Sequence, residues 1–283
     1  MNKYIHHANL ENILVVGKLL HFMRSIQTQV KYDYKYYVTG SLSPDKLINF
    51  LNKIDQIYFI GESSKDRYRR YQLNQATVQI ILFFPPSATE IYFILLARPG
   101  CNGSVNHIFF RAEKYKDLTL KNESLIINHY ILKRVNKEQY SFYDKDGSEK
   151  IVSGKNEVWT FDLTEKYVKD VIENIRIALI RRDNKTVTQI LRSFENVIPF
   201  HKVRSTYFKT AVRINERIRK FYEASNIDSS MDYIQPLKNK LSHLRASSIV
   251  KLNLEDLFFA FQFLRKNLLE EENIFFLLHI LEQ

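Results

Sequence analysis

The sequence predicts an α+β fold, with a mostly antiparallel sheet and helices in the N-terminal half and a helical C-terminal half. Alternating apolar runs, typical of strands, concentrate before residue 162, whereas helical spacing of apolar residues dominates after it. With 283 residues, 45% of them hydrophobic, the chain is long enough for one large domain or two ordinary ones. We therefore predict an α+β domain over residues 1–162 and a helical region over 163–283. Because no Pro- or Gly-rich linker separates the halves, a shared core is the alternative.

The first half is expected to alternate helices with strands. Helical spacing predicts helices over 9–28, capped by Asn9, and over 46–54, opened by Ser43 and Pro44. Alternation or short apolar runs predict the strands, which are 32–39, 56–60, 77–84, 90–97, 107–111, 125–133, 140–143 and 158–161. The segment 85–89 breaks both periods and predicts a hairpin connection. We expect one sheet of five or more strands with its helices on one side.

The second half is expected to be helical almost to its end. Asp162, followed three residues later by Glu165, matches a capping box. Apolar periodicity then predicts helices over 164–182, 186–196, 201–224, 232–245 and 254–281.

The segment from Asp144 to Glu149 superficially resembles the start of a calcium loop. An EF-hand loop needs a bidentate acid at its twelfth position, where this chain has Lys155. Asp-Gly is favoured in tight hairpins, so we predict a hairpin turn between strand-rich flanks.

No motif predicts a catalytic residue, a metal site or a cofactor. The glycine-rich loops that hold nucleotide phosphates are missing from the sequence. The single cysteine, Cys101, excludes an internal disulfide and a cysteine-based zinc site, and the histidines lack the spacing of a helical zinc site. We interpret Cys101, with His107 the only base nearby, as an incidental loop thiol.

The composition predicts a cytoplasmic protein that attracts anionic partners. Forty-two Lys and Arg residues against 31 Asp and Glu residues give a formal net charge of +11. The N-terminus does not resemble a signal peptide. The most apolar region, residues 254–281, is interrupted by charged residues, so we expect no membrane partner.

Two basic segments are the candidate nucleic-acid sites. Residues 65–71 interleave Arg67, Arg69 and Arg70 with tyrosines, a combination that neutralises phosphates and stacks on unpaired bases. A solvated connecting helix is the alternative interpretation of this segment.

The second segment covers residues 201–224, which carry seven basic residues and two acidic ones. On a helix, four of the cations form one stripe: Lys209, Arg213, Arg217 and Lys220. Apolar residues of another face would seat this helix on the core: Ala211, Ile214, Ile218 and Phe221. Like charges at this spacing repel by a few tenths of a kcal/mol each, so the stripe is mildly costly unless an anion uses it.

The C-terminal run 254–283 has the opposite character, with six acids against two basic residues and six phenylalanines among leucines. We expect core packing there, with a homo-oligomer or protein-partner interface as the alternative.

Three short runs resemble uncharacterised accessory proteins of integrative conjugative elements and plasmids: residues 36–40, 95–100 and 158–164. The resemblance covers the first 165 residues and assigns no site residue. It implies a bacterial DNA-handling role in the transfer, replication or maintenance of a mobile genetic element.

Three functions remain open from the sequence. The first is a nucleic-acid-binding accessory protein of a bacterial mobile element, with DNA the expected ligand and RNA the alternative. The second is a metal-dependent nuclease with dispersed groups such as Glu90, Glu113 and Lys114. The third is an interaction factor that inhibits or recruits a host complex through the acidic aromatic C-terminus.

Overall fold

The computed structural model describes residues 12–85, 88–136, 140–143, 149–152 and 157–225. These residues form two compact units that meet in the chain between Glu123 and Ser124, and each unit is described by itself. The boundary expected near residue 162 falls inside the second unit, because the strand that contains residue 162 leads directly into a helix of the same unit. The Asn9 cap and the expected helices over 232–245 and 254–281 lie outside the described residues.

The first unit, residues 12–123, is built on a five-stranded sheet. Its strands are β1 (Leu14–Val16), β2 (Tyr36–Leu42), β3 (Thr77–Phe83), β4 (Ile91–Arg98) and β5 (Lys116–Asp117), in the spatial order β1-β3-β4-β2-β5. Neighbouring strands are antiparallel except β1 and β3, which are parallel. The mostly antiparallel sheet and the β3–β4 hairpin are therefore confirmed.

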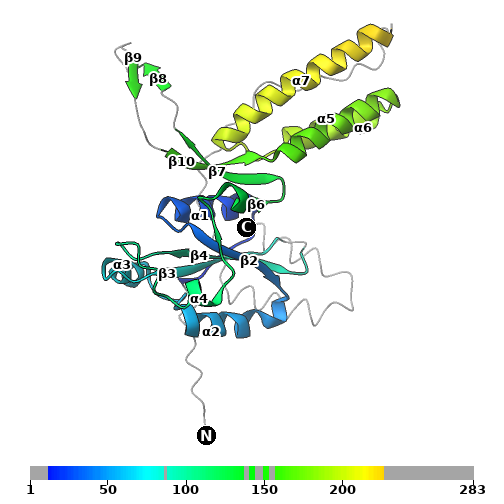
Figure 1. The fold of residues 1–283 in the computed structure, drawn as a ribbon. Coiled ribbons are helices and arrows are strands. Elements are labelled where there is room, and N and C mark those ends of the chain that lie inside the picture. Colours follow the sequence, from blue (N-terminus) through cyan, green and yellow to red (C-terminus); the bar gives the residue numbers. More distant parts are fainter. Residues whose placement is uncertain (1–11, 86–87, 137–139, 144–148, 153–156, 226–283) are drawn as a thin grey trace. The chain divides into compact units, whose positions relative to one another are not determined.

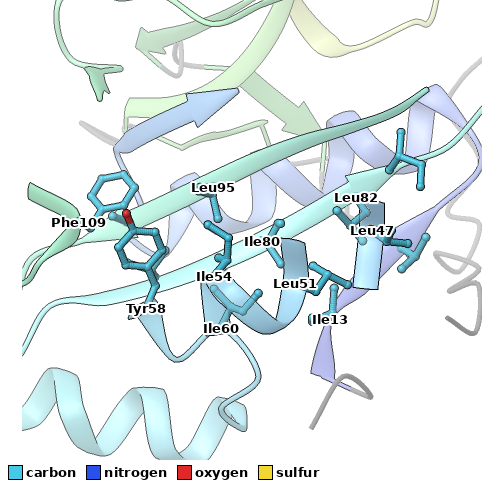
Figure 2. Packing of buried hydrophobic residues seen from close by; sticks show 14 of the residues in the cluster. Ile13, Leu47, Leu51, Ile54, Tyr58, Ile60, Ile80, Leu82, Leu95 and Phe109 are labelled. Atoms are coloured by element: carbon cyan, nitrogen blue, oxygen red, sulfur yellow. The ribbon is translucent and has the colours of Figure 1, made fainter. Parts of the chain in front are cut away.

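Helices cover both faces of this sheet (Figure 1), so the expectation of helices on one side is wrong. They are α1 (Leu19–Lys31), α2 (Leu47–Tyr58, after a 3-10 turn at Pro44–Lys46), α3 (Ser64–Gln72) and α4 (Phe109–Ala112). Alternate residues of β3 point to opposite faces. Phe83 stacks on Phe22 of α1, whereas Ile80 packs with Leu51 of α2 in the core shown in Figure 2.

Two expected strands of the first unit are helical instead. Residues 56–58 complete α2, whose C-cap Phe59 adopts a left-handed φ of 58° while Asp55 accepts a hydrogen bond from Gly61 N–H. Residues 109–112 form α4. These apolar runs are short, and periodicity alone does not separate a short buried strand from a buried helical turn.

The expected helix over 9–28 is also shorter than predicted. Residues 14–16 form β1, and α1 begins only at Leu19. The β-branched pair Val15 and Val16 is 1% and 0% exposed, in the pairing with β3. Burial in a sheet suits β-branched residues better than a helix does, and tertiary pairing outweighs the helical spacing here.

The second unit, residues 124–225, holds the remaining strands in two small sheets. One sheet has the order β10-β7-β6, and the other is a two-stranded hairpin of β8 and β9. The strands are β6 (Ile126–Ile127), β7 (Tyr130–Asn136), β8 (Tyr140–Tyr143), β9 (Glu149–Val152) and β10 (Glu157–Leu163). The antiparallel pairing of β8 with β9 confirms the hairpin predicted around residue 146.

Three described helices complete the second unit: α5 (Glu165–Ile180), α6 (Asn184–Glu195) and α7 (His201–Ser225). The helical character of the second half is thus confirmed as far as residue 225. Thr164, not Asp162, caps α5 by accepting a hydrogen bond from Tyr167 N–H.

Asp162 is 5% exposed within β10 and has a different role. Its carboxylate accepts hydrogen bonds from the Thr206 hydroxyl at 2.5 Å and the Leu163 N–H at 2.8 Å, and it lies 3.3 Å from Lys133 Nζ. A buried carboxylate needs such partners, and here they tie α7 to the sheet.

Candidate nucleic-acid interface

The inner face of α7 is apolar and packs against the rest of the second unit. Six side chains of this face are at most 8% exposed: Val203, Tyr207, Ala211, Ile214, Ile218 and Tyr222. Tyr207 stacks on Phe194 of α6 with ring centroids 4.9 Å apart. The predicted seating by Ala211, Ile214 and Ile218 is confirmed, while Phe221 is only partly buried and Tyr222 takes its place.

The opposite face carries the predicted cations. We call Lys209, Arg213, Arg217 and Lys220 the α7 stripe, and all four side chains are exposed. Among the described residues, Lys209, Arg213 and Lys220 form no ion pair or hydrogen bond. Arg219, which lies off the stripe, pairs with Glu223 at 3.6 Å. The positive charge of the stripe is thus largely uncompensated within the described chain.

One border of the stripe faces α5. Arg176 holds both carboxylate oxygens of Glu173, with nitrogen to oxygen distances of 2.7 to 3.1 Å. The pKa of Glu173 is lowered, first by these hydrogen bonds and also by the nearby charge of Arg217. The i,i+3 spacing of Glu173 and Arg176 is visible in the sequence, but their proximity to Arg217 is a tertiary feature that the sequence analysis missed.

The other border of the stripe is acidic, with one arginine and two apolar side chains beyond the acids. Glu216 follows Arg213 by three residues and precedes Lys220 by four, so it lies directly beside them on the helix surface. Glu223 borders Lys220 in the same way and is exposed. Beyond these acids lie Val212, 48% exposed, Phe208, 37% exposed, and Arg219, which pairs with Glu223.

The α3 segment contains the other predicted cations, and here the structure binds them into the first unit. Arg70 pairs with Glu62 at 2.8 Å, with both side chains under one quarter exposed, and its guanidinium lies 4.8 Å from the Phe59 ring centroid. Its Nε is buried with no hydrogen-bond partner among the described residues. Arg67 donates to the backbone oxygen of Glu62. Arg67 and Arg70 therefore hold α3 in place.

Arg69 and Tyr68 are the exposed members of the same segment. Arg69 lies 3.6 Å from Asp66, with its side chain 65% exposed, and Tyr68 is 58% exposed. Tyr71 is instead covered by Arg98, whose guanidinium lies 4.1 Å from the ring centroid. Of the three predicted arginines in α3, only Arg69 is freely presented to a ligand.

The groups considered for a nuclease are not brought together. Glu90 lies directly before the first residue of β4. Glu113 accepts a hydrogen bond from the Tyr58 hydroxyl. It follows Phe110 by three residues, and the ring of Phe110 packs on that of Tyr36. Tyr36 lies opposite Ala97, near the last residue of β4. The two acids are thus at opposite ends of an eight-residue strand, roughly 20 Å apart.

His107, the base nearest to Cys101 in the sequence, is engaged in its own local contacts. His107 is 8% exposed, and its Nδ1 accepts a hydrogen bond from Phe109 N–H. Burial and the charge of Arg70 lower the pKa of His107. Cys101 itself is exposed.

Neither a metal cluster nor a membrane-spanning helix is found in the described part of the chain. No three His, Cys, Asp or Glu side chains converge there on a common point that would hold an ion. No helix between residues 12 and 225 is long and apolar enough to cross a bilayer.

Comparison with protein-family models, with curated proteins and with solved structures found no match for the chain. The candidate interface therefore depends on its own geometry and charge.

Proposed function

We propose that the protein binds nucleic acid through the phosphate backbone and that the α7 stripe is its main contact surface. The observation that carries the proposal is a line of four exposed cations on a helix whose other face is buried. Phosphate neutralisation releases condensed counterions, and this term supplies most of sequence-independent affinity for nucleic acids.

The charge arrangement favours a ligand over a merely solvated surface. Like charges at i,i+4 cost a few tenths of a kcal/mol each, and three of the four cations have no partner in the described chain. Arg219 is balanced by Glu223, whereas Glu216, which lies beside Arg213 and Lys220, forms no ion pair among the described residues. An anionic ligand would supply the missing counter-charge.

Arg69 and Tyr68 on α3 form a secondary candidate surface within the proposal. Both side chains are exposed, and the pair joins a cation to an aromatic face that can stack on an unpaired base. Arg67 and Arg70 are assigned a structural role instead.

We also propose that the ligand is DNA of a bacterial mobile element, with RNA as the alternative. This part rests on the resemblance of the three short runs alone. The geometry around Glu90 and Glu113 offers no support for cleavage, so the proposed activity is binding.

The decisive experiment is a salt titration of binding for the wild type and for the variant Arg213→Gln, Arg217→Gln, Lys220→Gln. Glutamine keeps helix propensity and removes charge, so the fold should survive. Each lost phosphate contact lowers the slope of log K against log[salt] by about 0.7 to 0.9, and three lost contacts weaken binding about 100-fold at physiological salt.

A matched control removes three exposed charges from α5 and α6 instead: Lys166→Gln, Lys185→Gln and Arg192→Gln. This control has the same net charge as the α7 variant, and we expect it to retain most of the wild-type slope. DNA and RNA ligands with and without Mg²⁺ separate binding from cleavage. Equal slopes for the wild type and a folded α7 variant would contradict the proposal.

A further inference from the structure

The length of the α7 stripe matches a short run of phosphates. Its four side chains succeed one another by four, four and three residues, which on a helix are steps of about 6, 6 and 4.5 Å. These steps are comparable to the separation of successive phosphates along one nucleic-acid strand. The stripe therefore has room for about four phosphates in line.

The width of the stripe is a single side chain. On one border, α7 packs against α5, where Arg176 holds both carboxylate oxygens of Glu173. On the other border, Glu216 is exposed without an ion pair among the described residues, and Glu223 pairs with Arg219 at 3.6 Å. A second phosphate strand alongside the first would meet acids already paired with an arginine on either side, and the carboxylate of Glu216, unpaired within the described chain, on one side.

This arrangement differs from that of a helix which enters a groove of duplex DNA. A helix in the major groove, about 12 Å wide, has a phosphate strand on each side, and cations on both flanks serve it best. One flank of α7 packs with α5, and the other presents the unpaired Glu216 and the ion pair of Glu223 with Arg219.

We infer that the α7 stripe engages one phosphate strand at a time, as a run of about four phosphates, without straddling a duplex. This inference rests on the proposed function and specifies its ligand. The unpaired carboxylate of Glu216 disfavours a second strand more than the first, because the phosphates of the first strand lie on the cations of the stripe. Single strands and one strand of a duplex are then bound with similar numbers of contacts.

The test compares a twelve-nucleotide single strand with the duplex of the same sequence. Four contacts predict slopes of log K against log[salt] of about 3 for the single strand and between 3 and 4 for the duplex. A straddled duplex with twice the contacts would give a slope of about 7.

The variant Glu216→Gln, Glu223→Gln sharpens the comparison. Removal of both border charges is expected to raise duplex affinity about two- to fivefold and single-strand affinity by less than twofold. The control Glu165→Gln, Asp170→Asn removes two exposed acids from α5 and should leave the ratio of duplex to single-strand affinity unchanged.

A duplex slope near 7, or an equal response of both ligands to Glu216→Gln, Glu223→Gln, would overturn the one-strand inference while nucleic-acid binding stood. Absence of salt-dependent binding to either ligand would instead contradict the proposed function itself.

Discussion

Helices α3 and α7 are both rich in arginine, yet their cations have opposite fates. No residue of α3 is buried, and its arginines and tyrosines make the contacts that hold the helix to the first unit. The inner face of α7 is apolar and buried, with Ile214 and Tyr207 fully enclosed. A helix that is anchored by a buried apolar face keeps its cations available to a ligand. A helix without such a face is anchored by its cations, which are then not available.

The difference also appears in the surroundings of each cation. Arg70 has the carboxylate of Glu62 at 2.8 Å and the ring of Phe59 beneath it. Arg213 is exposed and has no ion pair or hydrogen bond to another described residue. Arginine content by itself is therefore a poor guide to a nucleic-acid site, and partner geometry decides which arginines can reach phosphate.

The test with the largest expected effect concerns the buried inner face of α7. Ile214→Ala should lower the free energy of unfolding of the second unit by about 2 to 4 kcal/mol, because it leaves a cavity at a side chain that is 0% exposed. Urea denaturation followed by the fluorescence of Trp159, the only tryptophan of the chain, reports on this unit. The control Val212→Ala, at a side chain that is 48% exposed, should change this free energy of unfolding by less than about 0.5 kcal/mol. Equal losses would mean that α7 is not anchored by its inner face.

The next test concerns the arginines of α3. Arg70→Gln should destabilise the first unit by about 2 kcal/mol, since it leaves the half-buried Glu62 carboxylate without its partner and removes the contact with Phe59. Arg69→Gln should cost less than about 0.5 kcal/mol, because its pair with Asp66 is exposed. Urea denaturation by far-ultraviolet circular dichroism measures both variants, and Trp159 fluorescence controls for the second unit. If Arg70→Gln left the free energy of unfolding unchanged, Arg70 would not anchor α3, and the difference between the cations of α3 and those of α7 would disappear.

The smallest expected effect is a pH dependence of the free energy of unfolding, to which the charge of Arg70 contributes. Burial, and then the charge of Arg70, lower the pKa of His107, and burial lowers that of His129 in the second unit. The folded state therefore binds protons less readily than the unfolded state, whose histidines titrate near 6.5. Stability should be level above pH 6.5 to 7 and fall as the pH decreases from there toward 5.

His107→Asn isolates the contribution of the first unit, because the Asn side-chain oxygen can accept the Phe109 N–H as His107 Nδ1 does. The loss between pH 7 and 5 should shrink for the first unit, with His21, whose pKa is also lowered, responsible for part of the remainder. Trp159 fluorescence should show the second unit unchanged, since His129 is intact there. An unaltered profile of the first unit would show that His107 does not titrate within this range.

Much of the fold was predictable where the signal is local. The α+β class, strands β3 and β4, helices α5 to α7 and the hairpin of β8 and β9 match the expectations from periodicity and turn residues. Local signals failed at Val15 and at residues 56–58, where pairing with β3 and continuation of α2 decided the structure. The division of the strands among separate sheets could not be predicted either. Alternation of apolar and polar residues indicates that a segment is a strand, but it does not identify the strand with which it pairs.

The sequence by itself determined the α7 stripe, since a helix of 3.6 residues per turn places Lys209, Arg213, Arg217 and Lys220 on one face wherever it packs. Only the tertiary structure decided which predicted cations are free. Arg70 is neutralised by Glu62, eight residues away, through the turn that follows α2, and Tyr71 is covered by Arg98 from β4. Such pairings depend on where separate elements meet in space, and a charge count along the chain carries no information about that.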